Sequence, residues 1–63
     1  MSNKIEEYQD FVAMMDFHEV ADQHTAATLA RKAAEESRIE GDFGQQAYFE
    51  ECAEAHEEAA QKL

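Results

Sequence analysis

The sequence contains no proline, and its only two glycines, Gly41 and Gly44, lie within four residues of each other. Proline and glycine are the residues that most often interrupt helices. The rest of the chain is rich in Ala, Glu, Gln and other strong helix formers. This composition predicts an all-α fold with one clear junction between helices, near Gly41.

Cysteine is nearly absent, since Cys52 is the only one. An intramolecular disulfide is therefore excluded, and a lone thiol is typical of a reducing compartment, so we expect a cytoplasmic protein. A chain of 63 residues buries only about 60% of its extended surface and is marginally stable alone. Without a disulfide or metal to stabilise it, we expect association with another chain.

Basic side chains are also scarce: 5 Lys and Arg stand against 15 Asp and Glu, for a net charge of −10. Direct binding to nucleic acid needs Lys and Arg to neutralise phosphates, so it is disfavoured, as is binding to anionic membranes. The longest apolar run, Phe11–Met15, is too short to span a bilayer. Residues 1–7 lack the apolar stretch of a signal peptide. The favoured partner is a protein with a basic or apolar surface.

The residues around the two glycines predict a turn at 41–44 between two helices. Gly41 suits the left-handed residue that closes a helix, and Asp42 with Gln45 forms a capping box for the next one. The helices are expected at about 25–39 and 43–62. Each carries an apolar stripe at helical spacing, which predicts an antiparallel hairpin. The stripes comprise Ala26, Leu29, Ala30, Ala33 and Ala34 in one helix, and Tyr48, Cys52, Ala55, Ala59 and Leu63 in the other.

The first third of the chain has two interpretations. In the preferred one, a first helix of about 4–21 ends at a polar break, 22–25, and packs on the hairpin. In the other, one helix of roughly 55 Å runs from Asn3 to Ile39. The fold is therefore a helical hairpin plus an N-terminal helix, with three helices or two, in a dimeric bundle.

Candidate catalytic and metal-binding patterns are incomplete. His18 and Glu19 begin a zinc-protease motif, but Asp22 occupies the position of the second histidine. Cys52 lies on an apolar stripe, and acidic surroundings raise the pKa of a thiol rather than lower it. We expect a buried side chain rather than an activated thiol. We therefore expect no catalytic residues, no metal and no cofactor, and a protein that is not an enzyme.

The segment Phe11–Phe17 is apolar around more of the helix than one core face requires. It is either core or an interface, and we expect a homodimer because the alanine-rich hairpin is too thin to cover it. The candidate self-association or partner surface is Phe11, Met14, Met15 and Phe17.

Acidic residues are concentrated in the second half of the chain. Between Glu35 and Glu58 there are nine acidic residues and one basic residue. This face either keeps the protein soluble or recognises a basic partner. The candidate recognition residues are Glu50, Glu54 and Glu57.

The whole chain resembles the short accessory proteins encoded between the exo and xis genes in the early left operon of lambdoid bacteriophages. The resemblance lies in the stretches 1–8 and 41–48. It implies early expression in the cytoplasm of the bacterial host and a role in favouring lytic development or in disturbing host growth control. We expect the protein to act by protein–protein interaction with host or phage factors. It implies no catalytic residues. The alternative function is that of an acidic nucleic-acid mimic that inhibits a DNA-binding protein.

Overall fold

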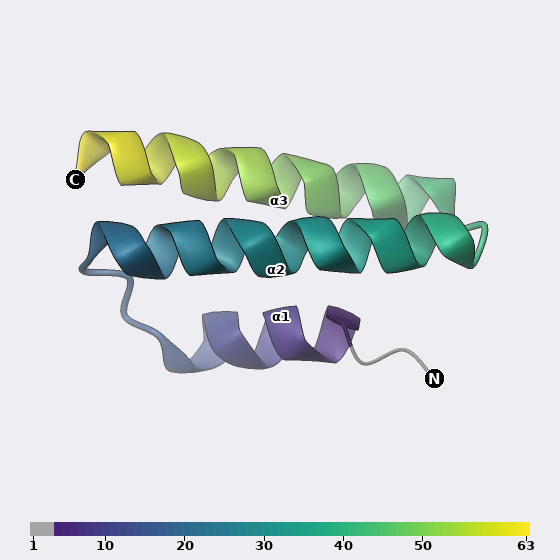
Figure 1. The fold of residues 1–63 in the computed structure, drawn as a ribbon, viewed down its shortest axis with the longest axis horizontal. Coiled ribbons are helices and arrows are strands. Elements are labelled where there is room, and N and C mark those ends of the chain that lie inside the picture. Colours follow the sequence, from purple (N-terminus) through teal and green to yellow (C-terminus); the bar gives the residue numbers. More distant parts are fainter. Residues whose placement is uncertain (1–3) are drawn as a thin grey trace.

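The computed structural model describes residues 4–63, and helices make up 85% of them. The three helices are α1 (Lys4–Met14), α2 (Val20–Ile39) and α3 (Phe43–Lys62), and no strand occurs within the described range. The predicted all-α fold is confirmed. In Figure 1, α2 lies between α1 and α3, and α1 covers only part of the length of α2. The molecule measures 35 × 19 × 12 Å.

The turn between α2 and α3 has the predicted geometry. Gly41 has φ +84°, and its N–H donates to the Arg38 carbonyl at 3.0 Å, while the Asp42 N–H donates to the Ser37 carbonyl at 2.9 Å. These two bonds satisfy carbonyls that the end of a helix leaves free. The Asp42 carboxylate accepts from the Gln45 N–H at 3.0 Å. The capping box is only half formed, because the Asp42 N–H donates to the Ser37 carbonyl rather than to the Gln45 side chain.

The hairpin interface is made mostly of alanines. The predicted stripe of α2 is buried apart from Leu29, which is half-buried. Small side chains let the two helix axes approach closely. The one large side chain that is fully buried at this interface is Phe49 of α3, with 1% of its surface exposed.

The predicted apolar stripe of α3 is wrong by one residue, or about 100° around the helix. Tyr48 and Leu63 are 60% and 61% exposed, and Ala55 is exposed too, while Cys52 and Ala59 are half-buried. The buried positions are instead Phe49, Ala53 and Ala60. This second stripe has equally good helical spacing, but the polar His56 interrupts it.

The break between the first two helices lies at residues 15–19 rather than at 22–25. The predicted helix 4–21 ends at Met14, and the predicted helix 25–39 begins at Val20. The alternative of one continuous helix is wrong as well; its proposed start at Asn3 lies outside the described residues. The chain turns at Phe17, whose φ of +60° is in the left-handed region. For a residue other than glycine, this conformation costs about 1–2 kcal/mol.

The polar segment 22–25 stays helical because its polar groups find partners. The Thr25 hydroxyl donates to the Ala21 carbonyl at 2.9 Å, and Gln23 is buried against α3, where it meets His56. Weak helix propensity is readily overridden by such tertiary contacts.

Helix α1 folds back onto the hairpin of its own chain. Tyr8 is 7% exposed, and its ring packs edge-on against Phe49 with ring centroids 5.7 Å apart. The half-buried side chains packed against the same core include Ile5, Phe11, Val12 and Phe17. The expectation that the hairpin is too thin to cover the first helix is therefore wrong for these side chains, because aromatic rings span the distance that alanines leave open. It holds for Met14, which is 81% exposed.

Candidate interaction surface and a buried histidine network

The three candidate acidic residues lie together on α3, opposite Arg31 of α2. Glu50 and Glu54 are exposed and Glu57 is half-buried. The Arg31 guanidinium forms an ion pair with Glu57. The pKa of Arg31 is raised by the hydrogen bond with Glu57 and by the charges of Glu57, Glu54 and Glu50. The structure thus brings the predicted residues into one acidic patch with a single guanidinium at its edge.

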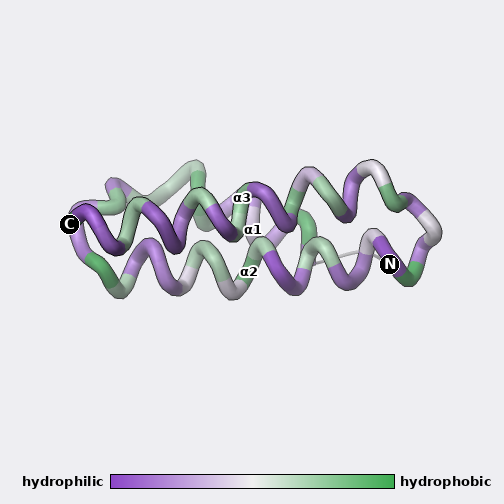
Figure 2. Tube along the Cα trace, turned by 90° about the horizontal axis from the view of Figure 1, so that it is seen from above, coloured by the Kyte–Doolittle hydropathy of each residue, from purple (hydrophilic) through white to green (hydrophobic). Residues whose placement is uncertain are grey.

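Large apolar side chains are exposed on the hairpin. Tyr48 of α3 is 60% exposed and lies about 200° around the helix from Glu50, so it is on the other side of α3 from the acidic patch. Figure 2 shows hydrophobic colour on both sides of the turn between α2 and α3, where Ile39 and Phe43 are 71% and 67% exposed. The sequence pattern did not predict that these three side chains are exposed, and it placed Tyr48 on a stripe expected to be buried.

The candidate self-association residues are not all available at the surface. Phe11 and Phe17 are half-buried and pack edge-on against each other, with ring centroids 6.0 Å apart. Met15 is half-buried, and Met14 is 81% exposed. Two of the four side chains therefore serve chiefly to hold α1 and the 15–19 linker on the hairpin.

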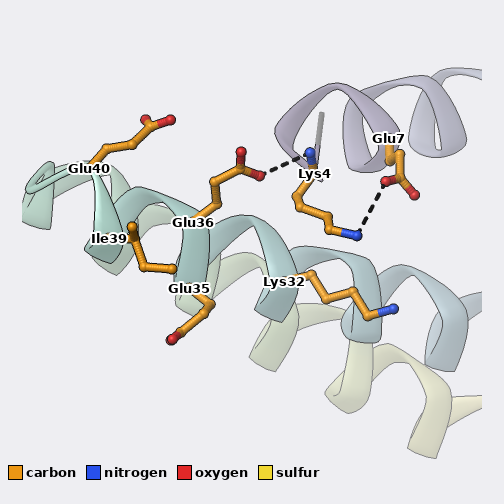
Figure 3. Close-up of a pocket in the computed structure, with 7 residues that line it drawn as sticks. All are labelled: Lys4, Glu7, Lys32, Glu35, Glu36, Ile39 and Glu40. Carbon is orange, nitrogen blue, oxygen red and sulfur yellow. Dashed lines mark hydrogen bonds and ion pairs between the residues drawn. The ribbon is translucent and has the colours of Figure 1, made fainter. Parts of the chain in front are cut away.

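An open groove lies between the start of α1 and the end of α2 (Figure 3). The Lys4 backbone N–H donates to the Glu36 carboxylate at 3.0 Å, and the Lys4 ammonium lies 3.8 Å from Glu7. Carboxylates outnumber ammonium groups among the lining residues, so the groove extends the acidic character of the surface. The lining residues are Lys4, Glu7, Lys32, Glu35, Glu36, Ile39 and Glu40.

The most specific arrangement of polar groups lies inside the molecule and links all three helices. The Tyr8 hydroxyl of α1 is 3.0 Å from Nε2 of His56 on α3. The other ring nitrogen, Nδ1, is 2.9 Å from the side-chain oxygen of Gln23 on α2. An amide oxygen only accepts, so Nδ1 carries the proton and donates to Gln23. Nε2 then accepts from the Tyr8 hydroxyl.

Aromatic packing surrounds this network. The Phe17 ring stacks on the His56 ring with centroids 5.4 Å apart and planes 23° apart, and Tyr8 meets His56 edge-on. Burial lowers the pKa of His56. Burial also raises the pKa of Tyr8, and the neighbouring Cys52 adds to that shift. Both rings are therefore held neutral, which matches the hydrogen bonds that they make.

Sequence reasoning did not single out His56 or Gln23. The sequence did contain one signal: His56 lies on the same helix face as Phe49, Ala53 and Ala60, at steps of three and four residues. A polar side chain in an otherwise buried stripe needs a buried hydrogen-bond partner. The partner itself, on another helix, is not visible in the sequence.

The other chemically active side chains are separated. His18 lies in the linker before α2 begins, so it does not share a helix with Asp22 as the sequence suggested. Cys52 is half-buried, and Tyr48 lies near it, since contact with Cys52 raises the pKa of Tyr48. Among residues 4–63, no three His, Cys, Asp or Glu side chains are grouped in a way that would hold a metal ion. Within the same range, no helix has the length and apolar content needed to cross a membrane.

The chain matches no protein-family model, no curated protein and no solved structure. The assignment of function therefore rests on its surface and on its internal contacts.

Proposed function

We propose that this chain is a non-enzymatic regulatory protein that acts by binding another protein through the outer face of α3. The observation that carries the proposal is the grouping of Glu50, Glu54 and Glu57 at adjacent turns of α3, with Glu50 and Glu54 exposed. Charges grouped on one surface steer a partner of opposite charge. The partner is accordingly a protein with a basic surface.

Internal bonding supports a role that is not enzymatic. His56 is the histidine that the fold encloses most, and both of its ring nitrogens are engaged by Tyr8 and Gln23. A general base needs a free nitrogen within reach of its substrate. The resemblance to lambdoid phage accessory proteins adds the setting: expression early in infection, in the host cytoplasm, and an effect that favours lytic development.

Affinity capture from a bacterial host extract, followed by mass spectrometry, tests this proposal. The baits are the wild type, a Glu50→Lys/Glu54→Lys/Glu57→Lys variant, and a control with the same change in net charge. The control is Glu6→Lys/Asp10→Lys/Glu19→Lys, three exposed positions outside α3. We expect the wild type and the control to retain a shared partner that the α3 variant loses. Equal retention by all three baits would contradict binding through this face.

The second candidate is an acidic nucleic-acid mimic, which is favoured by the grouping of three carboxylates at adjacent turns of α3. Its target would be a DNA-binding protein, so duplex DNA should compete with the chain for the partner. Binding should also weaken steeply as salt is raised, because each ionic contact is screened. A partner that binds this chain and DNA at the same time would exclude mimicry while leaving the first proposal standing.

Homodimerisation remains a prediction. Its candidate surface is smaller than expected, because Phe11 and Phe17 are half-buried. Met14, at 81% exposed, is the candidate residue that still reaches solvent best. Light scattering on a size-exclusion column at tens of micromolar tests it, with Met14→Asp as the disrupting variant. A dimer that Met14→Asp converts to a monomer supports the prediction, and a monomeric wild type refutes it.

A further inference from the structure

The attachment of α1 to the hairpin suggests a property beyond partner binding, because α1 is a weak helix by itself. The helix has 11 residues, and isolated helices shorter than about 12–15 residues are marginal in water. Its backbone packs along α2 alone, and it reaches α3 through the side chain of Tyr8. The stability of α1 therefore depends on a small number of side-chain contacts.

The hydrogen bond of Tyr8 and the stacking of Phe17 converge on a single titratable group, whereas Ile5, Phe11 and Val12 pack on the alanine core. His56 accepts a hydrogen bond from the Tyr8 hydroxyl of α1 and donates one to Gln23 of α2. The Phe17 ring of the linker stacks on the His56 ring. On α3 itself, Cys52 lies one turn before His56 and contributes to the raised pKa of the Tyr8 hydroxyl. The neighbours from all four segments are uncharged at neutral pH. None of them is a carboxylate that would stabilise a charged imidazole, and no charged group contributes to the pKa of His56.

A second proton on His56 would change the bonding directly. Nε2 accepts from the Tyr8 hydroxyl only while it carries a lone pair, and an imidazolium has donors at both nitrogens. The Tyr8 hydroxyl would lose its acceptor, and a charge would be placed on a part-buried ring that water reaches less well than it reaches an exposed histidine. Phe17, which the stacking holds in the left-handed region, would be free to return to a less strained conformation.

We propose that the Tyr8–His56–Gln23 network is a pH-sensitive latch that holds α1 and the 15–19 linker on the α2–α3 hairpin and releases them when His56 takes up a second proton. Release uncovers the part of the hairpin core around Phe49. The latch thereby connects the chemical environment to the exposure of an apolar surface, a property that the acidic patch on α3 does not require.

The direction of the pH effect follows from linkage. The docked state has the lower His56 pKa, so it binds fewer protons than the undocked state, and acid favours undocking. Docking is complete above the ordinary histidine pKa of about 6.5 and weakens as the pH falls below that value. At pH 5.5, one unit lower, the docking equilibrium constant should fall by up to about tenfold. This range lies above the ordinary pKa of carboxyl groups, about 4.

Amide hydrogen exchange at pH 7.5 and pH 5.5, corrected for the intrinsic exchange rate, tests the latch. In the wild type, protection of residues 5–14 should fall by several-fold, up to about tenfold, while residues 49–60 lose less. His56→Gln, which can donate and accept but does not titrate, should abolish the pH response. His24→Gln is the matched control, because His24 is exposed on α2, and it should retain the full response.

An NMR titration of the wild type keeps the test independent of the variants. The midpoint of the His56 ring signals should coincide with the midpoint of the loss of protection in α1. Three results would overturn the proposal: unchanged protection of α1 between the two pH values, a full pH response in His56→Gln, or an equal loss of protection in α1 and the hairpin.

Discussion

The interface between α2 and α3 is built from small side chains, whereas the contact that holds α1 is built from aromatic rings and a hydrogen-bonded histidine. In the first, Ala26, Ala30, Ala33 and Ala53 are fully buried, and many weak contacts add up along two 20-residue helices. In the second, Tyr8 and Phe17 supply most of the specific contacts. The α2–α3 interface, with many weak contacts, tolerates the loss of one of them. The attachment of α1, which depends on few side chains, does not.

Phe49 belongs to both interfaces, so its removal should have the largest effect. It is 1% exposed, it lies within the alanine core, and Tyr8 packs against its ring. Phe49→Ala should lower the free energy of unfolding by about 3–5 kcal/mol, a large share of the stability of a domain this small. Circular dichroism during urea denaturation measures this. A loss under about 1 kcal/mol would show that the two interfaces do not share this residue.

Enlarging an alanine should damage the hairpin because its helices lie close together. Ala30→Leu adds three carbons at a site with 0% exposure and should cost about 1–3 kcal/mol through overpacking. The same substitution at the exposed Ala55 is the control and should change stability by less than about 0.5 kcal/mol. Equal effects at both sites would contradict the close packing of α2 and α3.

Removing one hydroxyl should affect the contact of α1 selectively. Tyr8→Phe keeps the ring that packs on Phe49 but leaves Nε2 of His56 without its donor. A lost hydrogen bond to a part-buried group costs about 1–2 kcal/mol. Hydrogen exchange should show faster opening of α1 with the hairpin less affected. A uniform change across all three helices would mean that the hydroxyl stabilises the whole fold rather than the attachment of α1.

The turn belongs to neither interface and should show the smallest changes, with opposite signs at its two glycines. Gly41 has φ +84°, so Gly41→Ala should destabilise by about 1 kcal/mol. Gly44 lies in the first turn of α3, where an added Cβ would meet its nearest atom at 3.9 Å, an ordinary contact. Gly44→Ala should therefore stabilise by about 0.5–1 kcal/mol. Thermal melts of the two variants, side by side, check the signs.

Local chemistry in the sequence was sufficient for the all-α class, for the turn at Gly41–Asp42 and for the buried alanine stripe of α2. Each depends on neighbours within one or two helical turns: a residue that tolerates positive φ, a carboxylate that caps, and small residues at helical spacing. The grouping of Glu50, Glu54 and Glu57 was also predictable, because they share one helix at adjacent turns.

Only the tertiary structure decided which face of α3 is buried, where the first helix ends, and which of the two interpretations of the first third of the chain holds. All three depend on partners that are distant in sequence: His56 lies 33 residues from Gln23 and 48 from Tyr8. Burying Phe49 turns α3 by one residue, and His56 is then placed where Gln23 and Tyr8 can satisfy it. Side-chain periodicity determines that a helix has an apolar face, but the choice between two adjacent faces depends on the free energy of contacts between helices.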